Sequence, residues 1–249
     1  MMNRPFATLY PSSQKRNLFG HAVHELGSRI VRGDVRPGDT LPNEAELGRE
    51  LGASRTVVRE AVKSLASKGL IEPRTRVGTK VLPSTQWNLL DLDVLGWRYG
   101  AMPPMQFFRE LSELRRMIEP EAASLAAERA RPDDLAVMAK AYADMAAAES
   151  SSDAAINADI RFHRSILQAA HNALILQMGG LIGVGLMVSF DISSRSFETF
   201  LPQHRQVMDA IASRDPKLAR ATMDHLLTAT YGHLERELAG SIERSKSPA

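Results

Sequence analysis

Four residues of metal-binding types recur at helical spacing in the second half of the chain: Asp159, His163, His204 and His225. Each lies three or four positions from apolar residues, so each is expected on the inward stripe of an amphipathic helix. A buried polar group without a partner costs about 2–7 kcal/mol. A shared divalent cation would supply a partner for all four polar side chains. Imidazole together with carboxylate suits zinc, nickel, manganese or iron. The alternative is that each core histidine forms its own hydrogen bond.

Three helices must bring these residues together. Their expected inward stripes are Ile156, Ile160, His163, Leu167 and Ala170; Leu201, His204, Met208 and Ile211; and Leu218, Thr222, His225 and Ala229. From residue 86 onward the sequence has no run of strict alternation, and segments of helical period follow one another. We therefore predict an all-α bundle of six or seven helices over residues 104–243.

An almost uncharged segment, ALILQMGGLIGVGLMVSF, covers residues 173–190. Gly179 and Gly183 have the spacing that favours close helix approach in membranes, so a membrane span is one interpretation. The segment is of about minimum spanning length, contains Gln177 and has no companion span. A buried central helix is favoured, with glycines that let another helix or a ligand approach the backbone.

Charge is unevenly distributed along the chain. Residues 1–83 contain fourteen Lys and Arg against eight Asp and Glu, whereas residues 84–249 contain seventeen against twenty-one. A basic segment of this kind is typical of a domain that meets a polyanion. A solvated basic surface is the alternative.

The basic third has the start and stop signals of a helix-turn-helix. Residues 17–32 carry one apolar stripe, and Gly33 ends it. Asn43 has capping-box spacing and begins a short second helix that runs to about residue 51. Gly52 breaks that helix, and Ser54 is placed to cap a third. Two helices joined by a tight glycine turn predict a helix-turn-helix.

The third helix exposes Arg55 and Arg59 one turn apart. In a helix-turn-helix this element enters the major groove, where arginine can bond guanine O6 and N7. An ordinary solvated helix surface is the alternative. Residues 70–83, LIEPRTRVGTKVLP, predict two short strands around a basic turn that contains Arg74 and Arg76, which would form a wing.

Length and composition favour two globular domains. The chain has 249 residues, of which 44% are hydrophobic and 24% charged. It has no cysteine, which excludes disulfide scaffolds, zinc ribbons and thiol catalysis. The start, MMNRPFATLY, lacks the apolar core of a signal peptide, so we expect a cytoplasmic protein. We predict a flexible segment over 1–14, a DNA-binding domain over 15–83, and a linker helix over 84–103 whose Trp87 and Trp97 pack between domains.

The stretch PGDTLPNEAELGRELGASRTVVREAVKSLASKGLIEPRTRVGTKV resembles the winged-helix domain of the GntR superfamily of bacterial transcription regulators. The resemblance implies that operator DNA is contacted by Ser54, Arg55, Thr56 and Arg59, with Arg76 near the wing tip. Ala45 departs from the family pattern, which often has a DNA-contacting arginine there. That contact is therefore expected to be missing.

The pattern D-x-x-x-H followed by H-x-x-V-x-x-A-I resembles the metal-binding branch of the FCD effector domain, found in the FadR subfamily. The resemblance implies a divalent metal, zinc above all, with the ligands Asp159, His163, His204 and His225. The stretch ELSELRRMIEPEAASLAAERA resembles the first long FCD helix, which implies that Arg115 projects towards an effector pocket. A salt bridge from Arg115 to Glu119, one turn along, is the alternative.

Within the subfamily, the segments QWNLLDLDVLGW and LRRMIEPEAASLAAERA resemble galactonate-operon repressors. The resemblance implies a homodimeric repressor of a sugar-acid operon, released from a palindromic operator when a carboxylate effector binds beside the metal. A metal-dependent hydrolytic or lyase enzyme is the alternative, although no nucleophile elbow or P-loop is present. An architectural DNA-binding protein, indifferent to small molecules, is a third interpretation.

Overall fold

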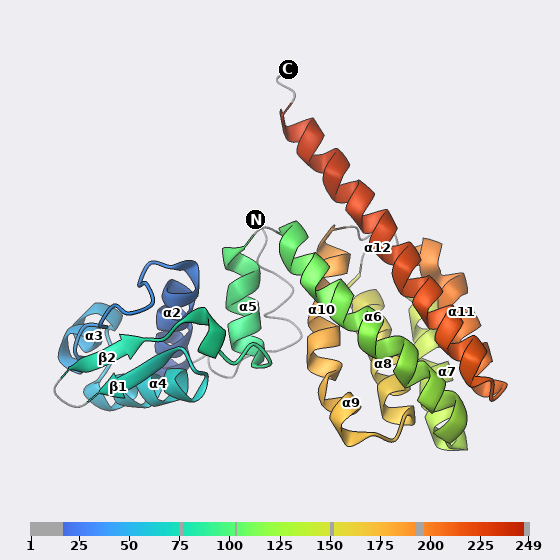
Figure 1. Cartoon of the computed structure of the whole chain (residues 1–249), viewed down its shortest axis with the longest axis horizontal. Coiled ribbons are helices and arrows are strands. Elements are labelled where there is room, and N and C mark those ends of the chain that lie inside the picture. The colour runs from blue at the N-terminus through green and yellow to red at the C-terminus, as the bar shows by residue number, and fades with distance from the viewer. Residues whose placement is uncertain (1–16, 75–76, 103, 150–151, 193–196, 247–249) are drawn as a thin grey trace. The chain divides into compact units, whose positions relative to one another are not determined.

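The computed structural model describes residues 17–74, 77–102, 104–149, 152–192 and 197–246 (Figure 1). The chain divides into an N-terminal unit, residues 1–104, and a C-terminal unit, residues 105–249. The segment 1–14, expected to be flexible, lies outside the described residues.

The N-terminal unit is a small helical domain with a β-hairpin. Its elements are α2 (Leu18–Arg32), α3 (Glu44–Leu51), α4 (Arg55–Ser67), β1 (Ile71–Arg74), β2 (Gly78–Val81), the 3-10 turn η2 (Ser84–Gln86) and α5 (Leu92–Ala101). The expected caps are present. Asn43 and Glu46 form a capping box at the start of α3, and the hydroxyl of Ser54 accepts from the backbone N–H of Val57 in α4. These caps set where α3 and α4 begin.

The hairpin follows α4 and closes the core of this unit. Strand β1 pairs antiparallel with β2, with Ile71 opposite Val81. Both of these side chains are buried with Leu65 and Leu70. The pairing thus fixes the strands against α4, as expected for a winged helix-turn-helix.

Helix α5 packs on α2 within the same unit. The ring of Trp97 lies against Gly27, and its Nε1 donates a hydrogen bond to Nδ1 of His24 at 2.9 Å. The buried ammonium of Lys68, at the end of α4, pairs with Asp91 at 2.7 Å and Asp93 at 2.9 Å. Two independent contacts therefore attach α5 to the helix-turn-helix.

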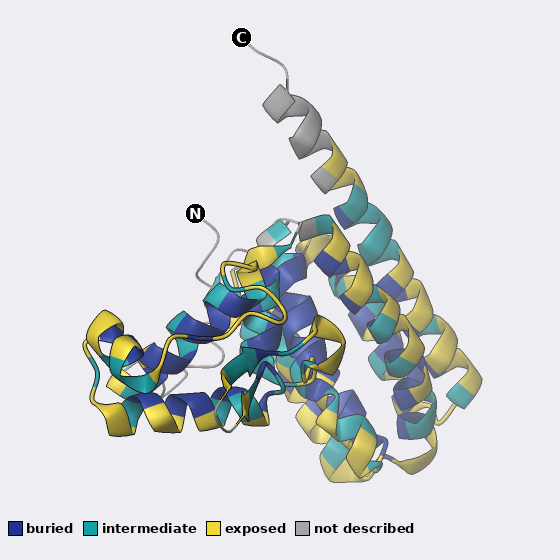
Figure 2. Cartoon of the chain, turned by 60° about the vertical axis from the view of Figure 1, so that its left-hand side comes forward, coloured by how far each residue is buried: buried dark blue, intermediate teal, exposed yellow. Residues whose placement is uncertain are grey.

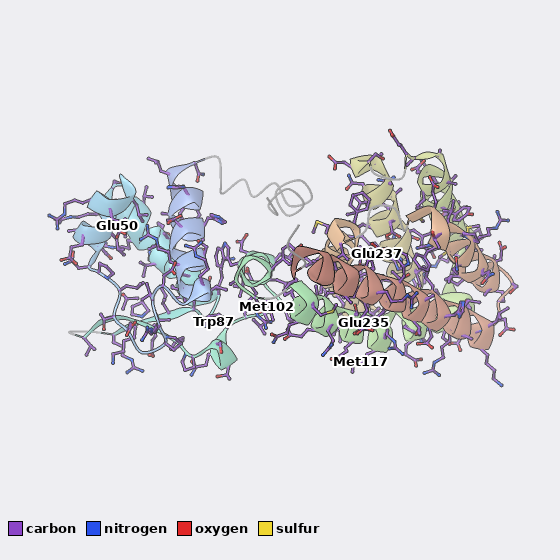
Figure 3. All side chains as sticks on the ribbon, turned by 90° about the horizontal axis from the view of Figure 1, so that it is seen from above. Glu50, Trp87, Met102, Met117, Glu235 and Glu237 are labelled. Carbon is purple, nitrogen blue, oxygen red and sulfur yellow. The ribbon has the colours of Figure 1, made fainter. Side chains whose placement is uncertain are left out.

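The segment QWNLLDLDVLGW is only partly helical. Asp91 caps α5 by accepting from the N–H groups of Asp93 and Val94, so the helix begins at Leu92. Trp87 precedes the helix (Figure 3), and its Nε1 donates to the carbonyl oxygen of Leu82. The expectation of one helix containing both tryptophans was wrong because an N-cap interrupts the apolar spacing.

Substitution of Gly27 by alanine tests the contact between α2 and α5. An added Cβ would lie 2.3 Å from Cη2 of Trp97, so the rigid indole or the helix must shift. We expect Gly27→Ala to lower the free energy of unfolding of this unit by about 1–3 kcal/mol, the usual cost of overpacking. The measurement is urea unfolding followed by tryptophan fluorescence. Gly100→Ala is the control, because nothing lies within 4 Å of its added Cβ. Equal urea midpoints for the two variants would contradict a close contact between Gly27 and Trp97.

The C-terminal unit is an all-α bundle. Seven of its helices are described: α6 (Pro104–Arg129), α7 (Pro132–Ala147), α8 (Asp153–Ala169), α9 (Ala173–Gln177), α10 (Gly179–Ile192), α11 (Phe197–Ala212) and α12 (Pro216–Lys246). Helix α7 packs along α8, and α11 packs along α12. Buried residues gather on the inner faces of these helices (Figure 2), around Phe162, Met138 and Met223. The predicted fold class, a winged helix-turn-helix followed by a helical bundle, is confirmed.

The uncharged segment 173–190 forms two helices instead of one. The chain breaks at Met178 between α9, where Leu174 is 78% exposed, and α10, which is buried from Leu181 to Ser189. Among the described helices, none is long and apolar enough to cross a membrane. The absence of a side chain at Gly185 lets α6 approach, since an added Cβ would lie 3.0 Å from Cδ of Arg115.

Candidate functional site

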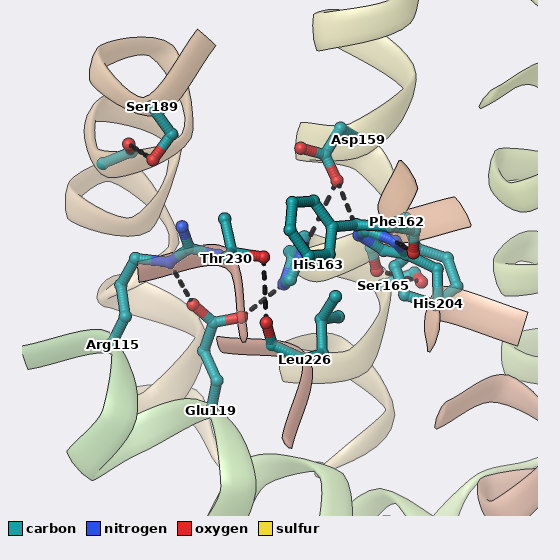
Figure 4. Close-up of polar contacts among 12 residues, drawn as sticks. Arg115, Glu119, Asp159, Phe162, His163, Ser165, Ser189, His204, Leu226 and Thr230 are labelled. Atoms are coloured by element: carbon teal, nitrogen blue, oxygen red, sulfur yellow. Dashed lines mark hydrogen bonds and ion pairs between the residues drawn. The ribbon is translucent and has the colours of Figure 1, made fainter. Parts of the chain in front are cut away.

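Three of the four expected metal ligands converge inside the bundle (Figure 4). Asp159 and His163 lie one turn apart on α8, and His204 faces them from α11. One ligand atom from each lies within 4.8 Å of the others. Oδ1 of Asp159 is 3.4 Å from Nε2 of His163 and 3.2 Å from Nε2 of His204. Both imidazoles thus direct the same ring nitrogen at one carboxylate oxygen.

The other nitrogen of each imidazole is held by a hydrogen bond. Nδ1 of His204 donates to the carbonyl oxygen of Phe200 at 2.7 Å, and Nδ1 of His163 contacts a carboxylate oxygen of Glu119. Both acceptors require a proton on Nδ1, which leaves Nε2 as the ligand atom. Metal-binding histidines are commonly oriented in this way, with the outer nitrogen donating to a carboxylate or carbonyl.

The donor set fits a divalent cation. Oδ1 of Asp159 is buried and has no hydrogen-bond partner of suitable geometry among the described residues. Such an atom is costly unless a charge compensates it. Two imidazole nitrogens and one carboxylate oxygen suit zinc, nickel, manganese or iron, and leave coordination positions for other oxygen ligands.

Burial and neighbouring charges set the ionisation of this cluster. Burial opposes ionisation of Glu119, but the charges of Arg115 and His163 outweigh it and lower the pKa of its carboxyl to about 2. Burial also opposes ionisation of Asp159, but His163 and His204 hold its pKa well below the ordinary value. Burial acts to lower the pKa of His163, yet Glu119 and Asp159 raise it to about 9. A cation would therefore take the place of a proton on His163, because the ligand form is neutral imidazole.

The cluster opens on a small cavity of about 50 Å³. Its lining residues are Arg115, Asp159, His163, Leu186, Ser189, Phe190, Phe200, His204, Leu226, Leu227 and Thr230. Arg115 is buried, and its Nε donates to Glu119 at 2.6 Å. Among the described residues its terminal nitrogens have no hydrogen-bond acceptor. Arg115 therefore forms the salt bridge to Glu119 and also lines the cavity, and its binding of an effector stays a prediction.

His225, the fourth expected ligand, is not in the cluster. It is exposed on α12, whose buried face consists of Ala219, Met223, Leu226, Leu227 and Leu234. The inward stripe expected through Leu218 and His225 was wrong by one position, which rotates a helix by about 100°. Leu226 and Leu227, instead of a histidine, line the cavity from α12.

Most of the expected DNA-contacting residues lie together on α4. Arg55, Thr56 and Arg59 are exposed along the helix, and Ser54 caps it. The guanidinium of Arg59 pairs with the carboxylate of Glu44 at 3.3 Å, so it must leave Glu44 to reach a base. Arg76 lies outside the described residues. The helix therefore presents its polar first turns as a helix-turn-helix recognition helix does.

Comparison with known proteins decides the family. Residues 18–81 match the family model of bacterial regulatory proteins, gntR family, and residues 110–229 match the FCD domain. The galactonate operon transcriptional repressor of Escherichia coli is 38% identical over 197 residues, covering 78% of this chain and 86% of the relative. The chain belongs to the GntR family, with an FCD domain. It is therefore a DNA-binding transcription regulator.

One further relative and one solved structure are similar to this GntR regulator over most of its length. The Uxu operon transcriptional regulator of E. coli is 28% identical over 205 residues, covering 78% of this chain and 77% of the relative. The solved structure of Lar, which controls expression of the Listeria monocytogenes agr system, matches with a TM-score of 0.64 at 18% identity. It covers 88% of this chain and 97% of that one, and supports the fold alone.

Glu119 is the site residue whose role the sequence did not reveal. Its spacing from Arg115 indicated only a salt bridge, whereas the carboxylate also contacts His163, 44 positions away in the sequence. A local sequence pattern cannot predict a contact between residues that lie 44 positions apart.

Proposed function

We propose that this regulator represses a sugar-acid operon as a cytoplasmic homodimer and is released from its operator when a carboxylate effector enters the cavity of the FCD domain. The observation that carries the proposal is the convergence of Asp159, His163, His204 and Arg115 on one cavity. The relatives named for galactonate and Uxu operons support the choice of a sugar acid.

The cavity has the chemistry to hold such an acid. Arg115 offers terminal guanidinium nitrogens, which bind carboxylates through charge-assisted hydrogen bonds. Ser189 and Thr230 line the wall, and each hydroxyl donates to a carbonyl of its own helix at 2.8 Å. Their oxygens remain available to accept hydrogen bonds from ligand hydroxyls. A divalent cation, zinc by preference, held by Asp159, His163 and His204 would add Lewis-acid positions for a carboxylate or hydroxyl oxygen.

Operator binding with titration of acids tests this function. The full chain, loaded with zinc, is mixed with fluorescent DNA from upstream of its own gene and the adjacent operon, and anisotropy is recorded at fixed salt. We expect tight binding that galactonate or a related sugar acid reverses. DNA binding that persists with every acid would contradict the effector class, and turnover of an acid would favour a metal-dependent enzyme instead.

Two arginines on α4 are expected to supply operator affinity. Arg55→Ala and Arg59→Ala should each weaken specific binding by about 10–100-fold, since a good arginine–guanine pair contributes about 1–3 kcal/mol. The measurement is the anisotropy titration at constant ionic strength. Arg205→Ala is the control, because Arg205 is an exposed arginine of the C-terminal unit, paired with Asp209. Equal affinities for all three variants would contradict the assignment of α4.

A further inference from the structure

We propose that Glu119 is a positioning residue that couples the metal site to the effector site, an inference that rests on the proposed function. Glu119 lies on α6, one turn after Arg115, and its side chain is 1% exposed. One carboxylate oxygen accepts from Nε of Arg115, and the other accepts from Nδ1 of His163 (Figure 4). A single buried carboxylate thus joins the residue expected to hold the effector to a residue that would hold the metal.

Towards the metal, Glu119 fixes both the tautomer and the direction of His163. The bond at Nδ1 leaves Nε2 facing Asp159, which is the orientation that a ligand needs. A carboxylate partner also makes the imidazole a stronger ligand, and loss of such a partner lowers metal affinity by about 10–100-fold. His204 has a neutral carbonyl at the corresponding position, so His163 is the ligand whose strength depends on a charged neighbour.

Towards the effector, Glu119 holds Arg115 by one nitrogen and leaves the fork of the guanidinium to the cavity. A ligand carboxylate bound to the terminal nitrogens of Arg115 would weaken the attraction between Arg115 and Glu119, because both carboxylates would then interact with the same guanidinium. Glu119 then interacts more strongly with His163, and the metal is held more tightly. Because coupling between binding sites is reciprocal, the metal must raise the affinity for the acid by the same factor.

Metal titrations of the full chain test this coupling. Zinc affinity is measured by competition with a chromophoric chelator, with and without saturating galactonate, for the wild type and Glu119→Gln. We expect the acid to raise zinc affinity about 5–150-fold in the wild type, the usual range of allosteric coupling. In Glu119→Gln we expect zinc affinity about 10–100-fold lower and a coupling factor clearly smaller than in the wild type, the remainder being due to direct contact of the acid with the metal. The control is Asp134→Asn, which alters the carboxylate beside His171 outside the cavity and should change neither quantity.

A structural role alone predicts a different outcome. If Glu119 only stabilised the bundle, Glu119→Gln would lower the thermal midpoint without zinc and leave zinc affinity unchanged, which would overturn the proposal. If Glu119→Gln fails to fold, Glu119→Asp is used instead, since it keeps the charge but has a side chain too short to contact both Arg115 and His163. A coupling factor between acid and zinc equal to that of the wild type would then overturn the proposal. If no sugar acid binds the wild type, the proposed effector class fails, while a loss of zinc affinity in Glu119→Gln still supports the positioning of His163.

Discussion

Alanine in place of His204 is expected to lower zinc affinity by more than about 100-fold, whereas alanine in place of His225 is expected to leave it unchanged. His204 supplies one of three converging ligand atoms, and its Nε2 has no substitute in the described part of the site. Removal of an outer partner alone costs about 10–100-fold in affinity, so removal of a ligand costs more. His225 is exposed on α12, and its loss changes no contact of the cluster.

The two histidine variants form a matched pair, because the same side chain is removed from adjacent helices of one domain. Chelator competition gives the affinities, and the thermal midpoint with excess zinc gives an independent readout. Zinc at 100 times the dissociation constant stabilises the folded state by about 2.7 kcal/mol, and this stabilisation should vanish in His204→Ala alone. An equal loss in both variants would show that α12 contributes the fourth ligand and that the three-ligand cluster is incomplete.

Sequence reasoning succeeded where a local signal determines the structure. The caps at Asn43 and Ser54, and the stripe through His163, each depend on neighbours within one or two helical turns. They define the helix-turn-helix, and they place Asp159 beside His163.

The sequence did not predict the structure where two faces of one helix were equally apolar. Helix α12 has apolar residues beside both candidate faces, so its sequence periodicity did not decide whether His225 or Leu226 points inwards; packing against α11 places Leu226 in the core. The contact of Glu119 with His163 and that of Trp97 with Gly27 join residues far apart in the sequence. Only the assembled fold brings such residues together.

Lysine in place of Arg115 is expected to raise the acid concentration needed for half-release of the operator by about 10–100-fold, with operator affinity in the absence of acid unchanged. A hydrogen bond to a charged group contributes about 1.5–3 kcal/mol. The guanidinium can bind Glu119 through Nε and still offer two nitrogens to a ligand, whereas an ammonium is a single point charge that cannot span both. Lysine keeps a positive charge beside the buried carboxylate of Glu119. Complete loss of that positive charge would lower the free energy of unfolding by about 3–5 kcal/mol.

The measurement is operator release followed by anisotropy at increasing galactonate concentration, at fixed salt and saturating zinc. Arg161→Lys is the control, since Arg161 is exposed on α8 and pairs with Asp144 away from the cavity lining. Far-UV circular dichroism and operator affinity without acid verify that each variant is folded. If Arg115→Lys releases DNA at the wild-type concentration, the carboxylate is held by other groups, and the contribution of Arg115 is confined to its ion pair with Glu119.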